Sequence, residues 1–158
     1  MLLGFCHWLS RTHISHIMRD STHGFAVVEM GHLLALAIFG GAVLLVDLRF
    51  LGWCFKLQPI GEIARQLLPL TVGGVAVMSV TGFALFLGGP VRYYHNPAFQ
   101  LKMVLFVVAL LFHFALQIGA SLQDDDKTRP TALLKVGAAL SLLLWLVIGL
   151  AGRAIGYV

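Results

Sequence analysis

The stretch that decides the fold runs from Gly24 to Val46 and reads GFAVVEMGHLLALAIFGGAVLLV. Its only ionisable side chains are those of Glu29 and His32. About 20 apolar residues, each rising about 1.5 Å in an α-helix, cross the hydrocarbon core of a bilayer. The stretch is therefore predicted to be a membrane-spanning helix.

Three further apolar stretches of similar length follow along the chain. We expect the four spans at about residues 24–46, 67–89, 98–120 and 131–152. Asn96 and Pro97, a favourable N-cap followed by proline at the first helical position, mark the start of the third span. The short connections predict that successive spans are antiparallel neighbours. The expected fold class is all-α integral membrane, an antiparallel four-helix transmembrane bundle that forms a single membrane domain over residues 1–158.

The composition indicates the same class of protein. Hydrophobic residues make up 59% of the 158 residues and charged residues only 11%, whereas about a quarter of the residues in soluble domains are charged. Few residues remain between the spans, so a separate soluble domain does not fit. The net charge of +4 comes from Lys and Arg scattered among the segment ends, which argues against nucleic-acid binding. The expected partners are the lipid bilayer and other membrane protein subunits.

Residues 1–23 form the expected interfacial segment ahead of the first span. Within it, the stretch from Arg11 to Thr22 mixes Ile14, Ile17 and Met18 with charged residues, as is typical of a short amphipathic helix in the headgroup layer. The first and third loops hold slightly more Lys and Arg than the termini and the second loop. We therefore expect these two loops in the cytoplasm and both termini outside.

The first span contains the sharpest local motif, Glu29-Met-Gly-His32. Ionisable residues inside a membrane are costly and usually face the bundle interior. At 100° per residue, one stripe of this helix carries its ionisable groups and is expected to face inward. The stripe consists of Glu29, His32, Leu36, Gly40, Val43 and Asp47.

In the third span, His113 lies in the middle of the helix and its face is also expected to point inward. Lys102, Ala109, Gln117 and Ala120 share that face. One buried imidazole from each of two helices is the arrangement that holds a b-type haem. His32 and His113 are therefore the leading candidates as ligands of the haem iron. Clearance for the porphyrin is expected from three small residues, Gly40, Gly74 and Gly82.

The depths of the two histidines in the membrane leave other pairs open. His32 and His113 differ in depth by about 10 Å at 1.5 Å per residue, although axial ligands must lie nearly level. His32 with His95, and His23 with His95, are the competing pairs near the amino-terminal side. Helix tilt can absorb part of the mismatch.

Three alternatives use the same residues differently. In the first, the two histidines form only structural hydrogen bonds and no cofactor binds. In the second, Glu29, His32 and one of His16, His23 or His95 bind copper or iron. In the third, Glu29 and His32 form a proton relay beside a quinone pocket. No catalytic motif is recognised: the sequence has no Gly-rich phosphate loop, nucleophile elbow or HExxH.

Several runs together resemble an uncharacterised family of small bacterial four-span inner-membrane proteins. They cover most of the chain from about residue 14 onward and read VEMGHLL at 28–34, LLVDLRFLG at 44–52, ARQLLP at 64–69, Thr81-Gly82, and YHNPAFQLK at 94–102. More distantly, the chain resembles cytochrome b and copper-resistance-D-type membrane bundles, which place histidines on inward faces. The resemblance implies a multi-pass protein of the bacterial inner (cytoplasmic) membrane, with His32 and His113 as ligand candidates. A dihaem cytochrome b carries two well-spaced histidines on each of two helices, which this chain lacks.

The leading hypothesis is a b-type haem membrane subunit that transfers electrons within a larger redox complex, with quinone as a redox partner. It is expected to carry electrons rather than to catalyse a reaction of its own. The alternative, from another class, is an accessory or structural subunit of a larger membrane complex that packs through its small residues and holds no cofactor.

Overall fold

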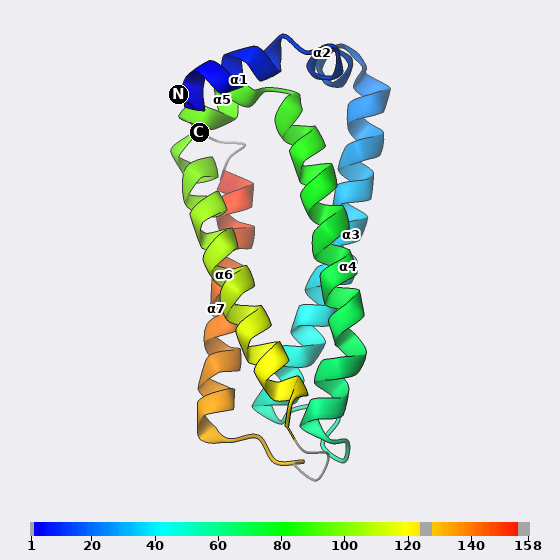
Figure 1. Cartoon of the computed structure of the whole chain (residues 1–158), viewed down its shortest axis with the longest axis vertical. Helices are drawn as coiled ribbons and strands as arrows, with labels where there is room; N and C mark the ends of the chain where they lie inside the picture. Colours follow the sequence, from blue (N-terminus) through cyan, green and yellow to red (C-terminus); the bar gives the residue numbers. More distant parts are fainter. Residues whose placement is uncertain (1, 124–127, 155–158) are drawn as a thin grey trace.

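The computed structural model describes residues 2–123 and 128–154, most of which are helical. The helices are α1 (Leu2–Ser10), α2 (His13–Asp20), α3 (Thr22–Leu51), α4 (Ile60–Leu87), α5 (Pro90–His95), α6 (Pro97–Ser121) and α7 (Ala132–Ala154). Within the described residues, α3, α4, α6 and α7 are long and apolar enough to cross a membrane. The predicted all-α membrane bundle with four spans is therefore confirmed (Figure 1).

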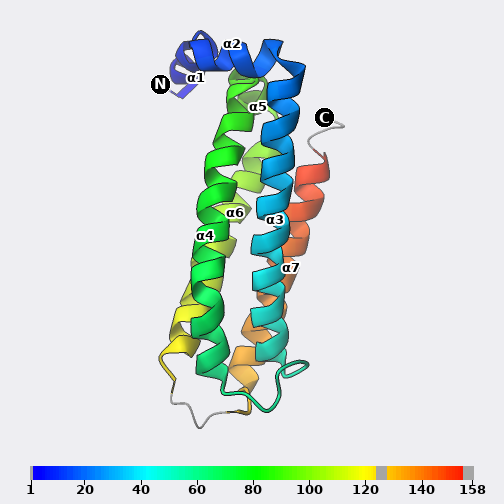
Figure 2. The ribbon, with the colours of Figure 1, turned by 90° about the vertical axis from the view of Figure 1, so that its right-hand side faces the viewer.

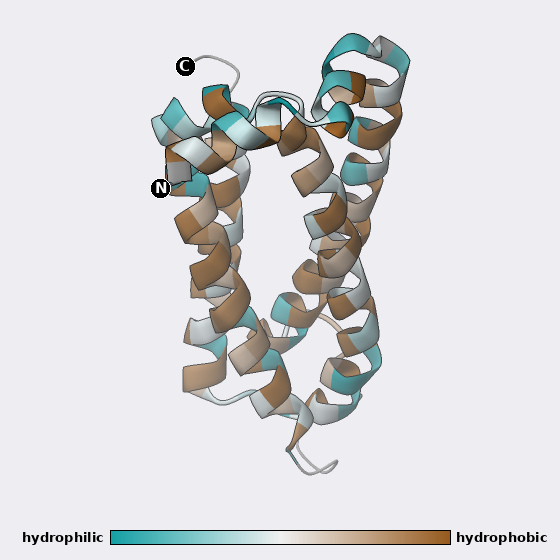
Figure 3. Ribbon diagram, turned by 45° about the horizontal axis from the view of Figure 1, so that its top comes forward, coloured by the Kyte–Doolittle hydropathy of each residue, from teal (hydrophilic) through white to brown (hydrophobic). Residues whose placement is uncertain are grey.

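The four long helices run side by side along the long axis of the molecule (Figures 1 and 2). α3 packs against α4 and α7, and α6 packs against the same two helices. α1, α2 and α5 lie across one end of the bundle, which we call the capped end. The opposite end, the loop end, holds the α3–α4 connection, the end of α6 and the start of α7. Figure 3 shows hydrophobic residues along the spans and hydrophilic ones gathered toward both ends, as expected for a bundle in a bilayer.

Local capping residues set several helix boundaries. The Asn96 side chain accepts a hydrogen bond from the backbone N–H of Phe99 at 3.0 Å, and Pro97 is the first residue of α6, which confirms the predicted start of the third span. At the end of α3, Gly52 adopts a left-handed conformation with φ of 80°. Glycine reaches this conformation without strain, so the chain turns there toward α4.

The second span differs from the prediction because α4 starts at Ile60 rather than at about residue 67. Its additional turns pack at the loop end against the end of α6. A Cβ atom at Gly61 would lie 2.8 Å from the carbonyl oxygen of Gln123. Pro69 lies inside the helix. Spanning helices tolerate proline because neighbouring helices and polar side chains bond the backbone groups that it frees.

The predicted amphipathic helix of the interfacial segment is confirmed as α2, and a further helix, α1, precedes it. Thr12 separates them, because its side chain accepts a hydrogen bond from the Ser15 N–H and caps α2. The buried Ser15 hydroxyl donates to the Leu87 carbonyl at 2.7 Å, which fastens α2 to the end of α4. The short helix α5, which starts at Pro90, was not expected from the sequence.

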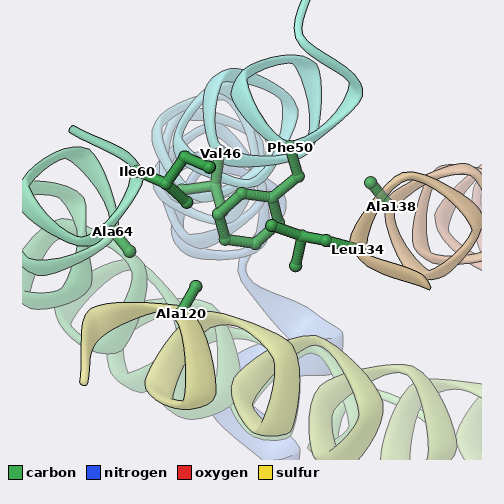
Figure 4. Close-up of a cluster of buried hydrophobic side chains, with 7 residues drawn as sticks. All are labelled: Val46, Phe50, Ile60, Ala64, Ala120, Leu134 and Ala138. Carbon is green, nitrogen blue, oxygen red and sulfur yellow. The ribbon is translucent and has the colours of Figure 1, made fainter. Parts of the chain in front are cut away.

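Two apolar clusters fill the bundle interior at different heights. The cluster at the loop end is drawn in Figure 4 and consists of Val46, Phe50, Ile60, Ala64, Ala120, Leu134 and Ala138. We call the second cluster the central cluster; its buried residues are Ala35, Phe39, Val43 and Met78, with Val75, Phe106, Leu110 and Trp145 packed against them. The Phe39 and Trp145 rings meet edge to face with centroids 4.9 Å apart.

Gly74 serves helix packing, not porphyrin clearance. A Cβ atom there would lie 2.9 Å from the Phe39 Cβ and 3.0 Å from its Cα, so α4 touches the α3 backbone at this point. Gly40, by contrast, has no atom within 4 Å of where its Cβ would be. The close α3–α4 contact is the small-residue packing typical of membrane helices.

Candidate functional site

A fully buried polar cluster, the inner centre, lies between three spans. It consists of Asp47 from α3, His113 from α6 and Ser141 from α7, each at most 1% exposed. The His113 Nδ1 atom lies 3.6 Å from Asp47 Oδ1 and 3.2 Å from Ser141 Oγ. One ring nitrogen thus faces both a carboxylate and a hydroxyl. A charge in such a place is stable only when it is paired, so the three side chains act as a unit.

Several polar atoms in and beside the inner centre have no protein partner among the described residues. In the inner centre they are both Asp47 carboxylate oxygens, for which no hydrogen bond is found, and His113 Nε2; Gln117 Oε1 follows one turn along α6, and the indole nitrogen of Trp145 belongs to the central cluster. Buried polar groups are almost always hydrogen-bonded to protein or water. Their concentration at one place marks a site that can exchange protons or hold a small polar molecule.

A polar line on α6 leads from His113 to the loop end. Gln117 and Ser121 follow His113 at intervals of four residues and are both buried, so they lie on one helix face about 6 Å apart. The Gln117 amide donates to the Ala64 carbonyl at 3.1 Å, and the exposed Arg65 donates to the Ser121 carbonyl at 3.1 Å. The line therefore joins the inner centre to the edge of the bundle.

Arg49 is also buried, but it stabilises the loop end and not the Asp47 carboxylate. Its Nη2 atom donates to the carbonyl oxygens of Gln58 at 2.5 Å and Thr128 at 2.7 Å. Residues two apart on a helix do not face each other. The guanidinium thus holds the α3–α4 connection against the chain ahead of α7.

A second polar group, the outer centre, lies toward the capped end. The His32 Nδ1 atom lies 2.9 Å from the Thr81 hydroxyl of α4. A Cβ atom at Gly82 would lie 3.1 Å from the His32 Cε1, so the imidazole sits directly against the α4 backbone. Lys102 of α6 lies within electrostatic range of the ring, and its Nζ is 3.3 Å from the Cβ position of Gly152 on α7. All four spans therefore contribute to the outer centre.

The structure does not bring His32 and His113 together. Asp47 contacts His113 and lies fifteen residues beyond His32 on the same helix, a distance of about 22 Å at 1.5 Å per residue. The central cluster fills the space between them. One porphyrin cannot be ligated by both histidines, so their predicted pairing does not fit this bundle.

The remaining predicted ligands lie on the outside. Glu29, His23 and His95 are exposed, and no hydrogen bond or ion pair described for the chain links them to His32. The predicted inward stripe of the first span is correct only toward the loop end. Val43 and Asp47 are buried there, but Leu36 is 44% exposed. His32, on the same stripe, still contacts Thr81 of α4 and is partly buried.

The predicted inward face of the third span is confirmed. Ala109, His113, Gln117 and Ala120 are all buried, and Lys102 is partly buried. The alternative copper or iron site, in contrast, is not formed. Among the residues that the structure describes, no three His, Cys, Asp or Glu side chains gather where they could hold one metal ion.

Comparison with known protein families agrees with the uncharacterised four-span resemblance. The model of a family of unknown function, DUF6644, matches residues 5–158. The chain belongs to this DUF6644 family. No curated protein and no solved structure matches it. The match covers nearly the whole chain and assigns no activity to either centre.

Sequence reasoning missed Asp47 and Ser141 as partners of His113. Asp47 is in the stripe predicted to face inward, but the prediction gives it no partner on another helix. The run Val46-Asp47-Leu48 was the available signal, because a carboxylate directly after an unbroken apolar run is often still inside the helix. Ser141 carried no signal beyond its position in an apolar span.

Proposed function

We propose that this protein takes up and releases a proton inside the bilayer at the inner centre. The observation that supports the proposal is the full burial of Asp47 and His113, 3.6 Å apart and beside Ser141. Holding one proton, the pair is neutral overall, either as carboxylate with imidazolium or as carboxylic acid with neutral imidazole. Losing that proton leaves one negative charge, and gaining a second leaves one positive charge.

We infer that the proton reaches the inner centre along the polar face of α6. Gln117 and Ser121 extend the polar line toward the loop end, where Arg65 is exposed. Toward the capped end, the central cluster closes the interior with Phe39, Met78 and Trp145. The loop-end cluster borders the polar line through Ala64 and Ala120, so neither end of the interior is an open path. The arrangement supports a site that stores or supplies a proton, not a continuous channel across the membrane.

The test is a pH-difference infrared spectrum of the purified protein in lipid nanodiscs. We expect a carboxyl band that Asp47→Asn removes and that His113→Gln shifts or removes. Glu29→Gln is the matched control, because Glu29 is an exposed carboxylate on the same helix, and the band should survive it. A band that persists unchanged in Asp47→Asn overturns the proposal.

If Asp47→Asn fails to fold, Ser141→Ala keeps the proposal testable. This variant removes the hydroxyl 3.2 Å from His113 but leaves the carboxylate and the imidazole in place. We expect the titration midpoint of the band to move while the helical content stays the same. An unmoved midpoint contradicts a proton shared within the centre.

A second candidate function, haem-based electron transfer, concerns the outer centre alone. His32 supports it, because Thr81 engages one ring nitrogen and Gly82 brings the backbone against the ring edge. A hydrogen bond to the ring nitrogen that does not bind the metal orients a histidine ligand, and Lys102 would supply a positive charge for a haem propionate. A b-type haem with quinone as redox partner is thus proposed with His32 as its one histidine ligand.

The haem candidate is tested by a reduced-minus-oxidised spectrum of protein purified from haem-replete cells. We expect a b-type α-band that His32→Ala abolishes and His113→Ala retains. A colourless wild-type protein refutes haem binding. If that colourless protein also co-purifies stoichiometrically with another membrane protein, it supports the accessory-subunit alternative.

A further inference from the structure

A groove at the capped end carries two arginines. One surface cavity of about 330 Å³ is lined by Met18, Arg19, Phe25, Gly88, Gly89, Arg92 and Tyr93. A second cavity of about 350 Å³ shares Arg19, Gly89 and Arg92 with the first and extends to His7 and Ser10 on α1. We call the two cavities together the arginine groove. Its size is within the range of small-molecule binding sites.

The guanidinium of Arg19 is held in place by the protein. Its Nη2 atom donates to the Ser10 carbonyl at 3.2 Å and to the Ser15 hydroxyl at 3.2 Å. Ser15 is itself fully buried and bonded to the Leu87 carbonyl. Both bonds use the same nitrogen, so the Nε and Nη1 donors of Arg19 remain free for a ligand.

Arg92 lines the same groove from α5, and neither arginine has a carboxylate partner in the described part of the chain. Two guanidinium groups around one cavity repel each other unless an anion lies between them. Arginine forms paired hydrogen bonds with phosphate oxygens. The groove therefore has the charge and the donor geometry for a phosphate group.

The position of the groove identifies the source of that phosphate. α3 begins at Thr22, α4 ends at Leu87 and α6 begins at Pro97, so the residues of the groove lie beside the ends of three apolar spans. Phe25 and Met18 supply an apolar wall beside the arginines. A free phosphate has no apolar part to contact that wall, whereas the first carbons of an acyl chain would pack on it.

We propose that the arginine groove binds the headgroup phosphate of an anionic phospholipid from the surrounding bilayer. The phosphodiester lies between Arg19 and Arg92, and the glycerol and upper acyl chain lie along Phe25 and Met18. The bound lipid bridges α2, α3 and α5 and fixes the interfacial helices on the bundle. This site is separate from both polar centres and does not depend on the proton proposal.

Native mass spectrometry of the detergent-purified full chain tests the proposal, with phosphatidylglycerol and phosphatidylcholine as probes. We expect the wild type to retain phosphatidylglycerol preferentially. Arg19→Gln and Arg92→Gln should each weaken retention about fivefold, the effect expected for one arginine near a membrane phosphate. Arg11→Gln is the matched control, because Arg11 is an exposed arginine of the same interfacial segment that does not line the groove.

Three results overturn the inference. If the wild type retains the two lipids equally, the groove does not select an anionic headgroup. If Arg11→Gln weakens lipid retention as much as Arg92→Gln does, retention depends on the general surface charge and not on the groove. Displacement of phosphatidylglycerol by millimolar inorganic phosphate assigns the groove to a free anion. Arg92→Gln keeps the test decisive if Arg19→Gln disturbs folding, because among residues 2–123 and 128–154 no hydrogen bond of the Arg92 side chain is found.

Discussion

Replacing the two partners of the inner centre, singly and together, tests whether Asp47 and His113 form one energetic unit. His113→Leu leaves the Asp47 carboxylate buried with no partner among the described residues. Breaking a buried ion pair from one side costs about 3–5 kcal/mol of folding free energy. Asp47→Ala is milder, at about 1–3 kcal/mol, because the His113 imidazole keeps the Ser141 hydroxyl at 3.2 Å.

The double variant should be more stable than the sum of the single effects predicts. Alanine at 47 with leucine at 113 roughly conserves the combined side-chain volume, and apolar replacement of a whole buried pair is often close to neutral. We therefore expect a coupling free energy of at least about 2 kcal/mol in the double-mutant cycle.

The assay is reversible unfolding in mixed micelles by titration with a denaturing detergent, followed by tryptophan fluorescence. Trp145 reports on the interior because it packs against Phe39. A control cycle combines Asp47→Ala with Val80→Ala, since Val80 is 71% exposed on α4, and it should be additive within about 0.5 kcal/mol. Additivity of the Asp47 and His113 cycle as well would refute the claim that the two side chains act together.

Three further predictions concern packing, the loop end and the outer centre. Gly74→Ala should destabilise the bundle by about 1–3 kcal/mol, because its Cβ would meet α3 backbone atoms at 3.0 Å. Gly73→Ala is the control and should leave stability unchanged, because nothing lies within 4 Å of its Cβ position. Equal losses of stability for the two variants in the same unfolding assay would contradict the packing role of Gly74. Arg49→Gln should lower the free energy of unfolding by about 2 kcal/mol, because a charged donor to two loop carbonyls is lost. An unchanged rate of proteolysis of the α3–α4 connection would contradict this role of Arg49. Thr81→Val should change the tautomer balance of His32, because the hydroxyl 2.9 Å from its Nδ1 atom is removed. The balance is measured by ¹⁵N-histidine NMR. A spectrum identical to that of the wild type would show that the hydrogen bond does not form in the bilayer.

The fold was predictable because its physical cause is local. Four apolar stretches can satisfy their backbone hydrogen bonds in lipid only as helices, whatever their neighbours are. The start of α6 followed from Asn96 and Pro97, since capping depends on residues adjacent in the chain. The inward face of α6 followed from helical periodicity around His113.

The pairing of side chains was not predictable from the same information. Periodicity places a residue on a helix face, but helix tilt and depth decide which residues of different helices meet. His32 and His113 both belonged on inward faces in the prediction, yet α3 presents Asp47 at the depth of His113 and places His32 beside Thr81. Glu29, predicted to face inward, is exposed.

The sequence alone determined that this chain is a bundle of spanning helices with an interfacial segment, because hydrophobic length and local capping act within each segment. Only the tertiary structure decided that its ionisable residues form two centres separated by an apolar cluster. That separation arises from the relative height at which four helices pack, which depends on contacts between residues far apart in the chain.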